Sequence, residues 1–461
     1  MSATPPVLFL VLDSMRTDRL GLYGHDRETT PVLDDLASGA TVYENAVAPA
    51  AWTLPSHCSM FTGLFPSEHG VTNGFLDATG TLQVSAEPLA KTLAGGGFRT
   101  GGFSNNPWVG GLSGLDAGFE EFVEWNLEVS ADSQAGIHTR RDRLYSRLHT
   151  LMGHAARQPV FLLKRRFFTA SLVERAKRWF AAAGSRQFTF LNLMEAHSPY
   201  FPPARAFREL ELSTPGVVEP RSLNTRLLAY VMGKTDLNPE RRERVLEYYD
   251  ASLRYQDRKV GELLEAFREA VEFEDALVVV CADHGKTLGE YDRDASPPHY
   301  LRDINITVPL VVKYPGQREG RRVADPVELT RLFDLVRDGG RNSLGSYTEP
   351  CSDGRRYGLV EEYVPHTGRE SETVTRWRGL VGPDYKYLRS EDGRAQLVER
   401  TPPGRREYAV EEPETASRLA ARLDERVGRL DPVESAEQSG STGEGDLGGG
   451  VEAQLEDLGY L

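Results

Sequence analysis

Residues 7–13 read VLFLVLD, a run of six apolar residues that ends in an aspartate. A continuous apolar run of this length is typical of a strand buried on both faces of a parallel sheet. Asp13 would then lie at the carboxyl end of the strand, which is where open α/β sheets bind their ligands. The segment therefore predicts a buried first strand that delivers a carboxylate to a candidate site.

Other segments of the chain are also typical of buried strands, and amphipathic stretches separate them. We expect further strands at Arg99–Ser104, Phe188–Met194, Ala276–Ala282 and Val308–Tyr314. Thr30-Pro31 is typical of a helix start, and strong helical patterns lie around Ser171–Ala183 and Arg241–Ala270. Apolar strands that alternate with amphipathic helices predict an α/β fold with a mainly parallel central sheet flanked by helices.

Changes in composition and hydrophobic pattern divide the 461 residues into three parts. We expect a catalytic α/β domain over residues 1–340 and a small C-terminal α+β subdomain over residues 341–430. In the subdomain, TRWRGLVG, DYKYLRS and RAQLVER predict an antiparallel sheet, and Glu411–Leu430 predicts a surface helix. Residues 431–461 are acidic and rich in Gly and Ser, so we expect a disordered tail with a short terminal helix.

Charge and hydropathy exclude several classes of protein. Lys and Arg number 54 against 68 Asp and Glu, a net charge of −14, which argues against binding to nucleic acid. No run approaches the ~20 apolar residues of a membrane span. The N-terminus lacks the basic start and cleavage site of a signal peptide, and three cysteines cannot build a disulfide framework. We therefore expect a cytoplasmic protein.

Polar side chains follow three of the expected strands. Asp13 ends the first strand, Glu195 and His197 follow the strand at 188–194, and Asp283-His284 follow the strand at 276–282. Each feature alone is typical of a helix cap or a turn. Because the carboxyl ends of parallel strands meet at one edge of a sheet, their coincidence predicts a divalent metal site.

Residues 52–63 read WTLPSHCSMFTG and add a candidate nucleophile. Pro55 suits the first turn of a helix and Gly63 its end, so Thr53 would lie just before the helix N-terminus, a position that favours anions. In isolation, Thr53 reads as a helix N-cap. Beside the acidic residues, we expect a nucleophile whose hydroxyl is activated by a bound metal.

Five motifs occur in order along the chain: VLFLVLDSMRTDRLGLYG, T-x-P-S-H with TGLFPSEHGV, MEAHSPYFPP, VVVCADHGKTLGE and the terminal LGYL. Together they resemble the sulfatase family of the alkaline-phosphatase superfamily, from residue 7 to about residue 315, with a weaker match in DYKYLRSEDG. The resemblance implies one divalent metal held by Asp13, Thr53, Asp283 and His284. It also implies that His197 and His299 contact the ester or the leaving group. We add His57 to the catalytic residues, and Lys286 and Glu195 as substrate-binding residues.

The chain departs from the family at several of these positions. Sulfatases carry C-x-P-x-R or S-x-P-x-R, whose first residue is oxidised to formylglycine, whereas this chain has Thr53 and His57. Oxidation of a threonine yields only a ketone, so we do not expect the formylglycine route. Ser14 replaces the usual second aspartate, and Leu193 stands where two-zinc relatives have an aspartate, which favours a single metal. Three oxygen ligands and one imidazole favour Mn²⁺, Zn²⁺ or Mg²⁺, while Ca²⁺, the family default, stays open.

These observations predict a metal-dependent hydrolase that cleaves a sulfate or phosphate ester of a small molecule or glycan through Thr53. Threonine nucleophiles also occur in relatives that transfer phosphate esters. A phosphoryl-group transferase acting on a glycan or lipid headgroup is therefore one alternative. The other is a non-catalytic binding protein on the same scaffold.

Overall fold

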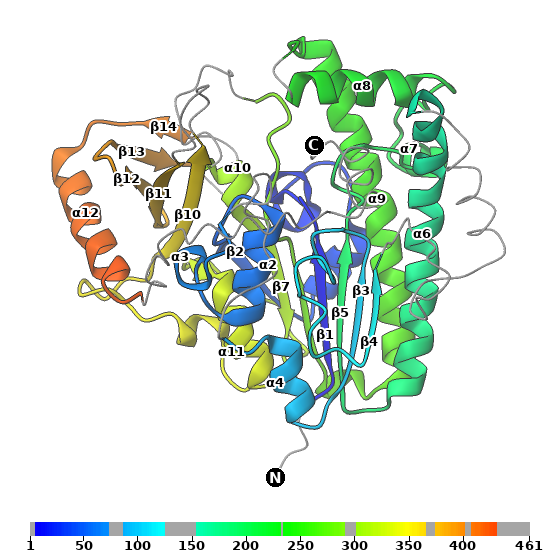
Figure 1. The fold of residues 1–461 in the computed structure, drawn as a ribbon, viewed down its shortest axis with the longest axis horizontal. Helices are drawn as coiled ribbons and strands as arrows, with labels where there is room; N and C mark the ends of the chain where they lie inside the picture. Colours follow the sequence, from blue (N-terminus) through cyan, green and yellow to red (C-terminus); the bar gives the residue numbers. More distant parts are fainter. Residues whose placement is uncertain are drawn as a thin grey trace, which may run out of the picture.

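Two β-sheets organise the protein (Figure 1). The computed structural model describes residues 5–72, 86–124, 154–231, 234–290, 301–365, 374–401 and 407–430. The predicted tail at residues 431–461 and the candidate residue His299 lie outside these ranges. Among the described helices, none has the length and apolarity needed to cross a membrane.

The larger sheet has nine strands in the order β4-β3-β5-β1-β6-β7-β2-β8, with β9 also paired to β2. Its strands are β1 (Val7–Leu12), β2 (Thr41–Val47), β3 (Arg99–Ser104), β4 (Glu121–Glu124), β5 (Gln187–Leu193), β6 (Leu277–Cys281), β7 (Thr307–Lys313), β8 (Arg321–Val323) and β9 (Val327–Glu328). β1 lies between β5 and β6, parallel to both, and all six of its residues are buried. The expected α/β fold with a mainly parallel sheet is therefore confirmed.

Strand β7 runs antiparallel to both of its neighbours, β6 and β2. It is the exception in this sheet, because the other pairings between described strands are parallel. An antiparallel strand begins at the edge where parallel strands end. The start of β7 at Thr307 therefore lies at the same edge of the sheet as the polar residues that follow β1 and β6.

Helices cover both faces of this sheet (Figure 1). The long helices α6 and α9 pack against each other on one side, while α2, α4 and α11 are in mutual contact on the other. The described α-helices are α1 (Pro31–Ala37), α2 (Thr53–Thr62), α3 (Pro66–His69), α4 (Leu89–Gly95), α6 (His154–Ala183), α7 (Ala204–Glu209), α8 (Glu219–Val231), α9 (Pro239–Ala270), α10 (Asp303–Ile306), α11 (Leu332–Arg337) and α12 (Pro413–Val427).

The smaller sheet is antiparallel and lies beside the larger one (Figure 1). It contains β10 (Gly358–Pro365), β11 (Val374–Val381), β12 (Tyr385–Ser390), β13 (Ala395–Arg400) and β14 (Glu407–Ala409). One of its faces shares an apolar cluster with the larger sheet; the cluster comprises Val47, Ala51, Leu301, Ile306, Val360, Trp377, Val381 and Leu388. Helix α12 contributes Leu419 and Leu423 to a separate cluster. The antiparallel strands and the C-terminal helix are as predicted, while the domain boundary at residue 340 stays a prediction.

Candidate active site

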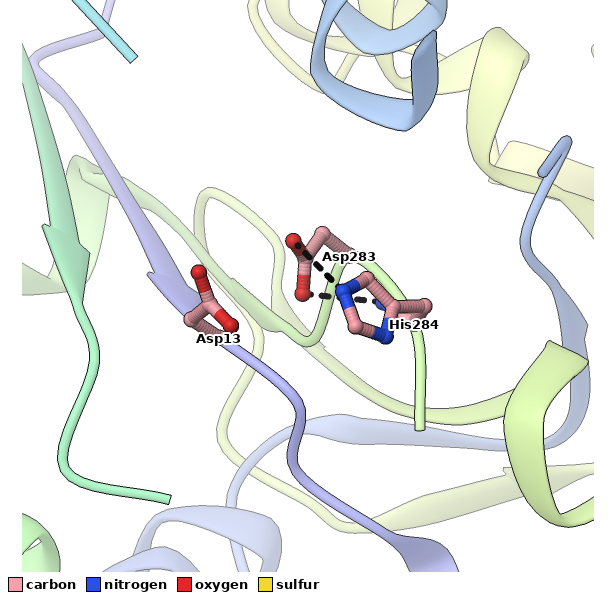
Figure 2. A group of neighbouring side chains, drawn as sticks. All are labelled: Asp13, Asp283 and His284. Carbon is pink, nitrogen blue, oxygen red and sulfur yellow. Dashed lines mark hydrogen bonds and ion pairs between the residues drawn. The ribbon is translucent and has the colours of Figure 1, made fainter. Parts of the chain in front are cut away.

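Three side chains with metal-ligand chemistry meet at the carboxyl ends of β1 and β6 (Figure 2). Asp13 follows β1, and Asp283 and His284 follow β6. One ligand atom from each lies within 4.8 Å of the others. All three side chains are buried. The register of β1 against β6, with Val11 opposite Cys281, explains why residues so far apart in the sequence come together.

Hydrogen bonds fix the orientation of both carboxylates. Asp283 Oδ1 accepts the backbone N–H of Ser14 at 3.0 Å and that of His284 at 2.9 Å. Asp13 Oδ2 accepts from Asn106 Nδ2 at 2.6 Å, and Asp13 Oδ1 accepts from the Ser14 hydroxyl at 2.8 Å. Ser14 adopts a left-handed backbone conformation, with φ of 60°, which is uncommon for a residue other than glycine. Both carboxylates are thus held in place by their neighbours.

The group has the electrostatic features of a cation site. Burial raises the pKa of the Asp13 carboxyl, and the nearby Asp283 carboxylate raises it further. Asp283 Oδ2 is buried and has no hydrogen-bond partner among the described residues. Two buried carboxylates are costly to hold together unless a positive charge lies between them. Carboxylate and imidazole donors suit Zn²⁺, Mn²⁺ or Mg²⁺, so the residues present fit a divalent metal.

Thr53 lies against this group as the first residue of α2. Its hydroxyl oxygen is 3.2 Å from His284 Nε2. The N-cap of α2 is Trp52 and no side chain caps the helix, so the structure contradicts both the placement of Thr53 before the helix and its interpretation as an N-cap. His284 Nδ1 is 2.6 Å from the Gly285 carbonyl, which can only accept. Nε2 therefore presents its lone pair to Thr53.

His57 lies one turn along α2 and is fully buried. Its Nδ1 donates to the backbone carbonyl of Thr53 at 2.8 Å and is 3.6 Å from Asp283 Oδ2. Its ring packs edge-on to Phe190 of β5, with the centroids 6.2 Å apart. Burial lowers the pKa of His57 to about 4, so the ring is neutral near pH 7. His57 thus contacts the backbone of Thr53; its predicted catalytic role stays a prediction.

The other predicted residues fall into different places. The Lys286 ammonium donates to the Ser198 hydroxyl at 2.7 Å, which places it next to His197, a buried residue. The Glu195 carboxylate instead accepts from the Thr169 hydroxyl of α6, and it is absent from the group formed by Asp13, Asp283 and His284. His299, as noted, lies outside the described residues.

Sequence reasoning missed Asn106, whose amide bonds Asp13. Asn106 follows β3 in the stretch SNN, at the same edge of the sheet as Asp13. The rule that selected Asp13, a polar residue directly after an expected strand, draws attention to the pair Asn105-Asn106. Which of the two reaches Asp13 depends on the path of the chain after β3. The role of Ser14 as a donor to both aspartates was not predicted, because it depends on the backbone conformation after β1.

Comparison with known proteins identifies related sequences. The model of the family described as Sulfatase matches residues 5–336. An ulvan-active sulfatase of Formosa agariphila is 24% identical over 412 residues, which cover 84% of this chain and 73% of the relative. Arylsulfatase A of Bos taurus is 35% identical over 103 residues, covering 22% of this chain and 20% of the relative.

Solved structures share the fold at low sequence identity. The phosphonate monoester hydrolase from Silicibacter pomeroyi matches with a TM-score of 0.68 and 19% identity, over 93% of this chain and 96% of the other. The phosphonate monoester hydrolase of Agrobacterium radiobacter matches with a TM-score of 0.63 and 17% identity, over 92% and 94% of the two chains. The small antiparallel sheet and the large sheet are therefore both part of a known architecture.

Proposed function

Because the chain belongs to the sulfatase family, a family of ester hydrolases, we propose that it hydrolyses a sulfate or phosphate ester through attack by the Thr53 hydroxyl. One observation carries this proposal. The Thr53 oxygen lies 3.2 Å from His284 Nε2, beside two buried carboxylates with the chemistry of metal ligands. A threonine that served only the helix would not need these neighbours.

The residues that would hold a divalent metal are Asp13, Asp283 and His284, with Thr53 as the fourth ligand. Such a cation would polarise the ester oxygens and favour the alkoxide form of Thr53. Mn²⁺, Zn²⁺ and Mg²⁺ suit this set of ligands best, and Ca²⁺ is the further candidate to be tested.

Side chains of the protein would orient the Thr53 nucleophile and donate a proton to the leaving group. His284 Nε2 faces the Thr53 hydroxyl, and its single lone pair would be the metal ligand when a cation is bound, so it does not also act as the base for Thr53. His57 donates to the carbonyl of Thr53 and thereby helps to orient that residue. In the proposed step, the Thr53 hydroxyl releases its proton to water and its oxygen bonds to sulfur or phosphorus. The ester bond to the leaving oxygen breaks, and that oxygen takes up a proton. His197 and Lys286, adjacent through Ser198, are the proposed donors to the leaving group. Water then attacks the sulfur or phosphorus of the threonine ester, releases the sulfate, phosphate or phosphonate product, and restores the Thr53 hydroxyl.

The substrate class follows from the relatives and the nucleophile. The relatives include an ulvan-active sulfatase and phosphonate monoester hydrolases, so the scaffold accommodates both sulfur and phosphorus esters. We propose a small-molecule or glycan ester as the substrate. Since a secondary alcohol cannot form formylglycine, turnover would pass through a covalent ester on Thr53.

The test is to trap that ester. Metal-stripped protein would be given each divalent ion in turn and assayed on an aryl sulfate, a phosphate monoester, a phosphodiester and a phosphonate. Rapid quench and mass spectrometry of the turning-over enzyme should place the added mass on the peptide that contains Thr53. Thr53→Ala should abolish turnover and Thr53→Ser should retain part of it. Mass on another residue, or full activity in Thr53→Ala, would overturn the mechanism.

A further inference from the structure

The short helix α10 contacts both halves of the proposed active site. The Ile306 carbonyl accepts the backbone N–H of Ala48 at 2.8 Å, in the segment that leads into α2 and Thr53. The Asn305 carbonyl accepts the backbone N–H of Gly285 at 2.7 Å, directly after His284. A Cβ on Gly285 would lie 2.0 Å from the Ile304 carbonyl oxygen, so only glycine permits this approach. Helix α10 therefore joins the segment carrying the nucleophile to the segment carrying a candidate metal ligand.

Side chains of the smaller sheet hold α10 in place. Asp303, the first residue of α10, is buried, and its Oδ1 accepts from the Lys386 ammonium at 2.9 Å. Its Oδ2 accepts from the Arg400 guanidinium, which also donates to Thr307 Oγ1 at 3.0 Å. The Lys386 ammonium makes a further hydrogen bond of 2.7 Å to the Leu301 carbonyl. Four oxygen atoms of Leu301, Asp303 and Thr307 are thus bound by two cations that belong to β12 and β13.

The neighbouring cations favour the ionised form of Asp303. Burial alone would raise the pKa of Asp303, but Arg400 and Lys386 outweigh it and hold that pKa below its ordinary range. Lys386 and Asp303 side chains are each no more than 2% exposed, so water screens the ion pair little. Lys386 lies in DYKYLRS, a motif that the proposed catalytic residues leave unexplained.

We propose that Lys386 and Arg400 are positioning residues of the active site. They fix Asp303, and through α10 they set the distance between Thr53 and His284. This inference rests on the proposed function, because it assigns importance to that distance. The smaller sheet would thus influence the reaction by positioning active-site residues. Among the described residues, none of its own side chains belongs to the candidate metal site of Asp13, Asp283 and His284.

A second buried ion pair offers a matched control. Arg426 of α12 bonds Glu328 of β9 at 2.6 Å, and both side chains are at most 4% exposed. This pair also ties the C-terminal part of the chain to the larger sheet, but among the described residues no hydrogen bond or ion pair joins it to α10. Arg426→Met and Lys386→Met therefore remove comparable buried cations, and only Lys386→Met acts on α10.

The experiment compares the two variants with the wild-type chain by three measurements. Deuterium exchange is followed in the peptides containing Gly285 and Ala48, Mn²⁺ or Zn²⁺ affinity is measured by calorimetry, and kcat and KM are measured on the best ester of the panel. We expect Lys386→Met to speed exchange in both peptides and to weaken the metal roughly 10- to 100-fold, the usual cost of losing a group that orients a ligand. We expect kcat to fall more than KM changes. Arg426→Met should lower thermal stability and leave exchange at Gly285, metal affinity and kcat near wild type. Exchange at Ala48 does not serve for this control, because Glu328 pairs with the neighbouring Val47.

Further variants keep the test decisive. Lys386→Arg should restore most of the lost metal affinity, because it retains a cation at Asp303. If Lys386→Met does not fold, the double variant Lys386→Met/Glu407→Gln removes the ammonium together with a carboxylate that it binds. Equal exchange, affinity and kcat in the Lys386 and Arg426 variants would overturn the inference. A wild-type chain that neither binds metal nor turns over any ester would instead overturn the proposed function, so the two failures are distinct.

Discussion

The two oxygens of the Asp283 carboxylate have different surroundings. Oδ1 accepts two backbone N–H groups, whereas Oδ2 is buried with no hydrogen-bond partner in the described part of the chain. Asn at this position preserves the acceptor and removes the charge. We expect Asp283→Asn to lose metal binding in calorimetry, with an affinity loss beyond the ~10- to 100-fold that loss of an orienting partner costs.

The fold should survive this change, because Asp283 lies at the edge of the sheet after β6. Asp35→Asn, on the exposed side of α1, is the control for loss of one carboxylate. Metal at 100 times its Kd should raise the free energy of unfolding by about 2.7 kcal/mol in the wild type. Chelator should remove that gain, and in Asp283→Asn there should be no gain to remove. Equal metal binding by the variant and the wild type would refute the ligand assignment.

His69 predicts a specific acid sensitivity. Its Nδ1 accepts the backbone N–H of Val71, its Nε2 contacts the Ser59 hydroxyl at 2.9 Å, and burial lowers its pKa to about 3. An unfolded histidine titrates near 6.5, so between pH 6.5 and pH 3 the unfolded state binds the extra proton. Stability therefore falls as the pH falls through this window, by about 2 kcal/mol at pH 5 from this one group.

The measurement is denaturant unfolding at pH 7.5 and pH 5 in the wild type and in His69→Gln. The variant should be less stable at pH 7.5, because it lacks the hydrogen bonds of His69. Its free energy of unfolding should fall less between pH 7.5 and pH 5 than that of the wild type, by about 2 kcal/mol. All other titrating groups are common to both proteins and cancel in the comparison. An identical pH dependence would show that His69 is not the buried neutral group described above.

At the scale of single elements, strand β10 carries an unusual carboxyl. Glu362 is buried, neither of its carboxylate oxygens has a hydrogen-bond partner among the described residues, and burial holds its pKa well above the ordinary value. The group is protonated in the folded state at a pH where the unfolded chain has already ionised it. Its contribution therefore destabilises the fold increasingly as the pH rises above about 4.5.

Glu362→Met should stabilise the protein for this reason. At pH 8 we expect a gain of about 1–3 kcal/mol, the cost of burying a polar group without a partner. The gain should shrink toward about pH 3.5, below the pKa of an unfolded glutamate, where the carboxyl is protonated in both states. Thermal unfolding of the variant and wild type at the two pH values measures it, and a variant less stable than wild type at pH 8 would contradict the assignment. Glu361→Met is the contrasting change, because Glu361 binds Arg378 and the Ser67 N–H and its loss should destabilise.

The elements predicted most accurately from the sequence are the strands whose limits are marked by polar or turn residues. β1, β3, β5, β6 and β7 match their predicted ranges to within a residue, because each is a compact segment set off by polar or turn residues. β2 was not predicted, since TVYENAV places Glu44 and Asn45 in its middle. The structure accommodates them where the pairing with β7 is irregular, between Tyr43 and Ala46. Glu44 pairs with Arg322, and Asn45 bonds the Ala324 carbonyl.

The candidate site was predictable to the extent that it depends on strand ends. Asp13, Asp283 and His284 follow apolar strands. Because the carboxyl ends of parallel strands meet at one edge of a sheet, their proximity could be predicted from the sequence alone. Asn106 and the anchoring of Asp303 by Lys386 could not be derived in this way. The first requires the local path of the chain after β3, and the second requires the relative placement of two sheets.

For the whole molecule, the contacts between the two sheets predict cooperative unfolding. The shared apolar cluster contains Val47 of β2 and Ile306 of α10 together with Val360 and Trp377 of the smaller sheet, and buried ion pairs join the same parts. We expect a single calorimetric transition, with a calorimetric enthalpy equal to the van't Hoff enthalpy. Two resolved transitions would show that the boundary predicted at residue 340 separates independently stable units.

The central position of β1 has a consequence for how the protein is made. Both of its neighbours are encoded far downstream: β5 begins at Gln187 and β6 at Leu277. At a ribosome speed of about 5–20 residues per second, roughly a quarter of a minute to a minute passes between the synthesis of Asp13 and that of His284. Until β5 is made, both edges of this apolar strand are unpaired, and the edge that faces β6 stays unpaired for the whole interval. Such a segment aggregates readily and is the kind that chaperones bind.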